Sequence, residues 1–297
     1  MAAVRLGSYL SMVVLCGGLA FLAFVWPQGA EVTGARRLLW ATVATGVVSS
    51  VLGVWLRPGA ARTPGAGGGL GLLVSGATAH DRVAGLLVVR GLLFLLAVPV
   101  LVALATAGQR AVRSPGWLVA AAAVGVGLLR TPGLAGHAGE GAGGWLGSVA
   151  DMVHLLGIAV WLGGLLVLCA VVLPRRRPEE LSGVVPRYSS LAFGAIAAAL
   201  AGGAVMSWRL VGGLEGLTGT RYGHVLLVKL MAMAAILVAA RSSKSWVDHR
   251  LEGAVAATAP GASPAVRPFA VSVAVEATLA MVSLGAASVL VGTSPGR

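Results

Sequence analysis

The sequence predicts an all-α protein, a polytopic bundle of about eight transmembrane helices that forms a single membrane domain over residues 1–297. Composition predicts this class, because 57% of the residues are hydrophobic and only 11% are charged, whereas a soluble domain carries about 25% charged residues. The apolar residues also lie in long runs, and roughly 20 such residues span a bilayer. The alternating pattern of a β-barrel is not visible, so helices are the expected spanning elements.

The expected spans follow the apolar runs in order along the chain. The first run begins just after Arg5 and is followed by another span, so we interpret it as a helix rather than a cleaved signal peptide. The fourth is the weakest, because Arg113 and Arg130 bracket it closely. The stretch 70–79 is too short to cross and is expected to be interfacial or re-entrant. The spans are expected near 8–27, 37–56, 86–107, 115–130, 148–173, 189–212, 223–240 and 269–292.

Small residues recur inside the expected spans, where they let helix backbones approach closely. The two cysteines lie inside apolar runs and form no CxxC pair, so we expect small buried hydrophobic side chains rather than a disulfide or a thiolate metal site. The small residues are Gly17-Gly18, Gly163-Gly164 and Gly202-Gly203, and the two cysteines are Cys16 and Cys169.

Linkers and a faint repeat indicate how the chain is organised. The Pro/Gly-rich segments 57–70 and 253–268 are expected to be solvated linkers, too short to form domains. RVAGLLVVR (82–90) aligns with RYGHVLLVK (221–229), and in each a loop cation is followed eight residues later by a cation inside a helix. This repeat favours two parallel four-helix halves.

The basic residues indicate orientation rather than nucleic-acid binding. The net charge is +12, but the cations lie in short clusters between apolar runs, so the expected partner is the lipid bilayer and no nucleic acid. With eight spans, twelve loop cations fall on one side and eight on the other. The positive-inside rule then places both termini on the outer side. Several possible metal ligands fall in or beside outer-side segments: His80, His137, His154, His224, Glu140 and Asp151.

Segment 136–164 carries the strongest candidate site. Asp151 and His154 are three residues apart on the fifth span and are expected to share a helix face, and His137 precedes them in a glycine-rich loop. A carboxylate beside an imidazole can fix its tautomer and raise its basicity. The alternative is that His154 is only a polar side chain at the level of the lipid headgroups and forms a simple hydrogen bond with Asp151. Trp161, seven residues after His154 on the same helix face, would then serve packing only.

Three further ionisable residues fall inside expected spans. Arg90 and Lys229 lie near the outer ends of their helices, and we expect them to reach the headgroups by snorkelling. The alternative for Lys229 is to balance Glu276 or Asp151 inside the bundle.

The order of the motifs resembles the copper resistance D family of bacterial membrane proteins. The matches run from about residue 130 to 297, whereas the first half matches in hydropathy and span number only. The motifs are GHA (136–138), DxxH (151–154), WLGG (161–164), RYSSLA (187–192), TxYGxxLLxK (220–229) and RPFAVSVAVEA (267–277).

This resemblance implies an eight-helix protein of the bacterial inner membrane that is tied to copper uptake or tolerance. A separate periplasmic copper-binding protein is the implied partner, because no such domain is fused to this chain. Carried over by position, His137 and His154 are expected to contact copper, with Asp151 as a third ligand or a supporting group. His224 is a weaker candidate metal ligand, and no organic cofactor is expected. Imidazole suits copper.

We therefore expect copper import or transport and no enzyme activity. No P-loop motif is present, so ATP-driven pumping is unsupported. One alternative is a b-type cytochrome-like oxidoreductase in which His154 and His224 hold haem, although axial ligands usually lie deeper in a bundle. A third alternative is an assembly factor for a copper enzyme.

Overall fold

The computed structural model describes residues 2–56, 82–135, 144–175 and 177–211, and these residues form helices and short connections without strands. Among the described residues, six helical segments are long and apolar enough to cross a membrane: Ala3–Val25, Thr33–Trp55, Arg82–Ala107, Pro115–Leu134, Gly144–Arg175 and Glu179–Trp208. The first six expected spans are thus confirmed, and the chain is a multi-pass membrane protein. The expected spans 223–240 and 269–292 lie outside the described residues, as do the linkers 57–70 and 253–268 and the stretch 70–79. The single domain and its two halves stay predictions.

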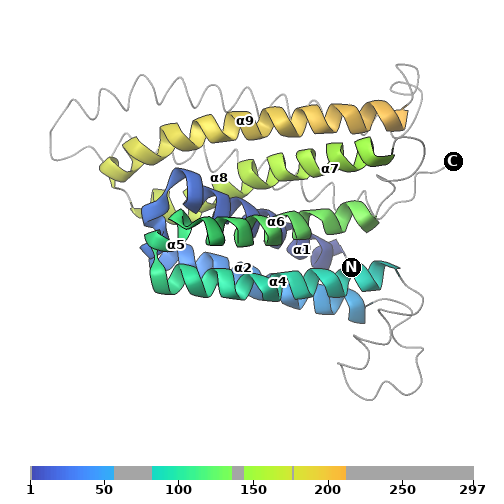
Figure 1. Cartoon of the computed structure of the whole chain (residues 1–297), viewed down its shortest axis with the longest axis horizontal. Coiled ribbons are helices and arrows are strands. Elements are labelled where there is room, and N and C mark those ends of the chain that lie inside the picture. The colour runs from blue at the N-terminus through green and yellow to red at the C-terminus, as the bar shows by residue number, and fades with distance from the viewer. Residues whose placement is uncertain (1, 57–81, 136–143, 176, 212–297) are drawn as a thin grey trace, which may run out of the picture.

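The long helices run side by side as an up-and-down bundle (Figure 1). Helix α1 packs against α2, α6 and the middle of the fifth span, α2 packs against α4, α4 packs against α6, and α7 packs against α9. The bounds are α1 (Ala2–Ala20), α2 (Thr33–Trp55), α4 (Arg82–Ala107), α5 (Gln109–Arg113), α6 (Pro115–Ala135), α7 (Gly144–Ile158), α8 (Gly164–Val167) and α9 (Pro178–Val211).

Helices α6 and α9 are two of the helices that extend beyond the spans expected from sequence. Helix α6 continues past Arg130 to Ala135, and Arg130 donates a hydrogen bond to the backbone oxygen of Ser148 on α7, at 3.4 Å. Helix α9 begins at Pro178 rather than near 189, with two glutamates in its first turn. Proline at the first helical position and acidic residues in the first turn both favour a helix start.

Short irregular segments interrupt or end the helices. In the part of the chain that the structure describes, three are π-helical turns, of which η4 lies between α7 and α8 and contains most of the WLGG motif. Such turns are rare and frequently occur at functional sites. The irregular segments are η1 (Phe21–Val25), η2 (Pro27–Glu31), η4 (Ala159–Gly163), η5 (Leu168–Val172) and η6 (Leu173–Arg175).

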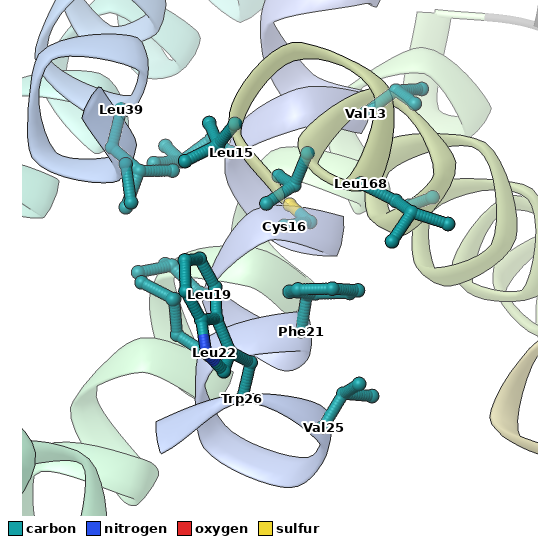
Figure 2. Packing of buried hydrophobic residues seen from close by; sticks show 14 of the residues in the cluster. Val13, Leu15, Cys16, Leu19, Phe21, Leu22, Val25, Trp26, Leu39 and Leu168 are labelled. Carbon is teal, nitrogen blue, oxygen red and sulfur yellow. The ribbon is translucent and has the colours of Figure 1, made fainter. Parts of the chain in front are cut away.

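The core centres on α1, whose apolar side chains pack between neighbouring helices (Figure 2). At the crossing of α1 with η4, a Cβ atom on Gly17 would overlap the backbone of Ala159 and Gly163, and one on Gly163 would overlap the backbone of Val13. The predicted packing role of these glycines is therefore confirmed. Cys16 is 7% exposed beside Gly125, as expected for a small buried side chain.

Candidate metal site at one end of the bundle

One end of the bundle is formed where α1 and α7 begin and where α6 and α9 end (Figure 1). Buried and half-buried polar side chains of these helices and of α4 lie near this end. They form two groups. The His154 cluster consists of Asp151 and His154 on α7 with Ala199 and Gly203 on α9, and the Arg90 cluster consists of Ser8, Tyr9, Arg90 and Thr131.

His154 is held by the backbone of the neighbouring helix. Its Nδ1 atom lies 2.6 Å from the backbone oxygen of Ala199 on α9, and the imidazole is half-buried. A carbonyl oxygen can only accept a hydrogen bond, so Nδ1 must carry the proton. The hydrogen bond to Ala199 thus determines that Nδ1 is the protonated ring nitrogen.

Glycines allow α7 and α9 to approach closely enough for this hydrogen bond. A Cβ atom on Gly157 would lie 2.7 Å from the nitrogen of Ala199. A Cβ atom on Gly202 would lie 2.8 Å from the nitrogen of His154. These positions bring the two backbones into direct contact, which is how small residues join helices in lipid.

Asp151 lies on α7 one turn before His154 but rests against α6. Its side chain is buried, at 8% exposure, and a Cβ atom on Gly133 of α6 would overlap its Oδ2 atom. Arg130 and His154 both lie within electrostatic reach of the carboxylate. A buried carboxylate near the mouth of a membrane bundle needs such compensation, and by default it marks a function.

The structure brings Asp151 and His154 together on α7, but the two side chains contact different neighbouring helices. Asp151 lies against α6, whereas the Nδ1 atom of His154 bonds to α9, so the ring is oriented by the Ala199 carbonyl rather than by the carboxylate considered from the sequence. The other expected ligands, His137 and His224, lie outside the described residues. Within the part of the chain that the structure describes, no three His, Cys, Asp or Glu residues group together.

Trp161 takes part in packing. Its side chain is 6% exposed, and its backbone oxygen accepts a hydrogen bond from the Tyr188 hydroxyl on α9 at 2.5 Å. The packing alternative for Trp161 is therefore confirmed. The hydrogen bond is a second tie between the fifth span and α9.

Arg90 does not snorkel, and that expectation is wrong. Its side chain is 6% exposed. Nε donates to the Thr131 hydroxyl at 2.8 Å and Nη1 donates to the Ser8 hydroxyl at 3.0 Å. The guanidinium carbon also lies 5.8 Å from the centre of the Tyr9 ring. These partners come from α1 and α6 and hold the cation inside the bundle, so it need not reach the headgroups.

Comparison with known proteins identifies a family for the C-terminal part of the chain. Residues 182–290 match the family model described as Copper resistance protein D, CopD. No curated protein and no solved structure matches the chain. Ala199 and Gly203 lie inside the matched segment, whereas Asp151 and His154 precede it. The chain is thus a multi-pass membrane protein that carries a copper resistance protein D family domain over residues 182–290.

Proposed function

We propose that this protein imports or transports copper across a bacterial plasma membrane in support of copper resistance or homeostasis. The observation that carries the proposal is the family match over residues 182–290, which includes most of α9 and therefore Ala199, whose backbone oxygen bonds to His154. In this proposal the protein is a carrier without catalytic activity. Both termini lie on the outer side, so the end of the bundle with His154 faces the exterior.

Copper is the cargo in this scheme, and the proposed capture site uses four residues. His154 and Asp151 supply an imidazole nitrogen and a carboxylate oxygen close together on α7. Both are donor types that bind copper, and imidazole suits it well. His137 and His224 complete the proposed set, with His224 the weaker member. A separate periplasmic copper-binding protein delivers the metal.

The first test is copper accumulation in cells. We expect cells that express the wild type to gain copper and cells that express His154→Ala to stay at the level of the empty host. His249→Ala is the matched control, because residue 249 lies between the expected spans 223–240 and 269–292, on the side that the positive-inside rule assigns to the cytoplasm. This variant should behave as the wild type. Equal accumulation by wild type and His154→Ala at equal protein levels contradicts the proposal.

Purified protein distinguishes transport from the two other functions considered. Copper uptake by vesicles that contain this protein alone supports transport, because an assembly factor would carry no copper without its client enzyme. An absorption spectrum of the purified protein tests the haem alternative. We expect no Soret band, and a stoichiometric band would replace copper transport by electron transfer.

A further inference from the structure

We propose that α9 is the positioning element of the copper site, and that it presents Nε2 of His154 as the metal-binding nitrogen. Two groups on α9 do this, the Ala199 carbonyl and the bare backbone at Gly203. The inference rests on the proposed function, because the role of His154 as a copper ligand belongs to it. It adds which nitrogen binds and which helix controls that choice.

The hydrogen bond to Ala199 decides the tautomer. The 2.6 Å contact requires the proton on Nδ1, and a neutral imidazole carries only one ring proton, so the lone pair is on Nε2. A metal-bound histidine commonly donates its other N–H to a carbonyl or carboxylate, which fixes the ring and raises its basicity as a ligand. The bond between α7 and α9 therefore prepares His154 before any metal arrives.

Gly203 confines the same edge of the ring. A Cβ atom on Gly203 would lie 3.1 Å from Nδ1 and 3.2 Å from Cε1 of His154. Contacts this short require the neighbouring atoms to shift by a few tenths of an ångström. The ring must then move away from α9, which lengthens its hydrogen bond to Ala199. Glycine at 203 thus keeps the imidazole seated against the helix.

Different glycines of α9 lie against different parts of the neighbouring structure, so the ring contact can be tested apart from general helix packing. The nearest atoms to a Cβ on Gly203 belong to the His154 ring, whereas those around a Cβ on Gly202 are backbone atoms of α7. A Cβ on Gly194 would have nothing within 4 Å. Gly203→Ala therefore tests the ring, and Gly194→Ala is a matched control for the same chemical change on the same helix.

Substitution of His154 by asparagine separates anchoring from metal binding. The asparagine amide can donate to the Ala199 carbonyl in place of Nδ1, but it offers no imidazole nitrogen to a metal. We expect His154→Asn to keep the thermal stability of the wild type and to lose the copper site. His154→Leu should lose both, because it removes the donor as well.

The experiment uses the full-length protein in lipid nanodiscs with ¹⁵N-labelled histidine. The ¹⁵N spectrum of the metal-free protein, at a pH where imidazole is neutral, reports the tautomer, and the spectrum of His154→Asn identifies the His154 signals. Affinities for Cu(I) and Cu(II) are then measured by competition with a chelator. We expect protonated Nδ1 and unprotonated Nε2 in the wild type. Gly203→Ala should mix the tautomers and weaken copper binding by about 10-fold or more, and Gly194→Ala should change neither.

The tautomer measurement and the affinity measurement test the inference independently of each other. A wild-type His154 protonated on Nε2 overturns the inference without any variant, so it stays testable if Gly203→Ala does not fold. A Gly203→Ala protein with unchanged tautomer and affinity also overturns it. If Nδ1 is protonated as expected but His154→Asn binds copper as the wild type does, the geometry of the ring stands and the proposed function fails.

Discussion

The Arg90 cluster and the His154 cluster lie at the same end of the bundle, yet they compensate their buried polar groups in different ways. Arg90 donates to two neutral hydroxyls, from Ser8 and Thr131, on two other helices. His154 donates a hydrogen bond from Nδ1 to a backbone carbonyl, and its second ring nitrogen, Nε2, retains a lone pair. Asp151 beside it is an acceptor with electrostatic support from Arg130.

This difference separates a structural polar cluster from a candidate ligand site. A guanidinium has only donors and stays charged, so the Arg90 cluster cannot bind a cation and repels one. An imidazole with one bonded nitrogen and a carboxylate still have lone pairs to offer. Burial of a polar residue in a membrane bundle is therefore not enough to predict a metal site. A candidate metal site also needs side chains with lone pairs that are available to the ion.

The largest stability effect is expected in the Arg90 cluster. Thr131→Val keeps the side-chain shape but removes the hydroxyl that accepts from Nε of Arg90. Hydrogen bonds to charged groups contribute about 1.5–3 kcal/mol, and we expect a loss near the upper end, about 3 kcal/mol, because the guanidinium is buried. Unfolding of the purified protein by heat in detergent, followed by circular dichroism, measures it.

The matched control lies on an exposed surface of α4. Thr106 is exposed, and its hydroxyl bonds to carbonyls of its own helix, so Thr106→Val should cost little. Copper affinity should be unchanged in both variants if the two clusters act separately. A similar stability loss in both variants would show that the Arg90 bond contributes nothing specific.

The second effect concerns how closely α7 and α9 pack. Gly157→Ala places a methyl group against the backbone of Ala195 and Ala199, so the helices must separate or bend. Overpacking of this kind costs about 1–3 kcal/mol, and we expect about 2 kcal/mol from the same thermal measurement. Gly183→Ala, where a Cβ atom meets nothing within 4 Å, should leave the stability unchanged. Equal stability of the two variants would mean that α7 and α9 do not pack at this distance.

The sequence predicts the six described spans well, because lipid solvation imposes long apolar runs. It also predicts that glycines such as Gly17 and Gly163 serve packing. Such features depend on residues near in sequence or on composition. They need no knowledge of which helices are neighbours.

The sequence predicts contacts between helices poorly. The partners of Arg90 lie 41 and 82 residues away, so nothing near it in the chain indicates that its charge is compensated inside the bundle. The Ala199 carbonyl has no signal at all, because every residue carries the same backbone oxygen. The π-helical turn η4 is equally hidden, since WLGG reads as ordinary helix with packing glycines.

The smallest expected effect distinguishes a supporting carboxylate from an idle one. Asp151→Asn keeps the size of a side chain that fits against Gly133 but removes the negative charge close to His154. We expect copper affinity to fall about 10-fold, which corresponds to about 1.4 kcal/mol, in the chelator competition described above. The control is Glu180→Gln, which makes the same change in a carboxylate that pairs with Arg175 at 3.0 Å at the opposite end of the bundle. If both variants bind copper as the wild type does, Asp151 compensates Arg130 only, and the His154 cluster contributes the imidazole alone.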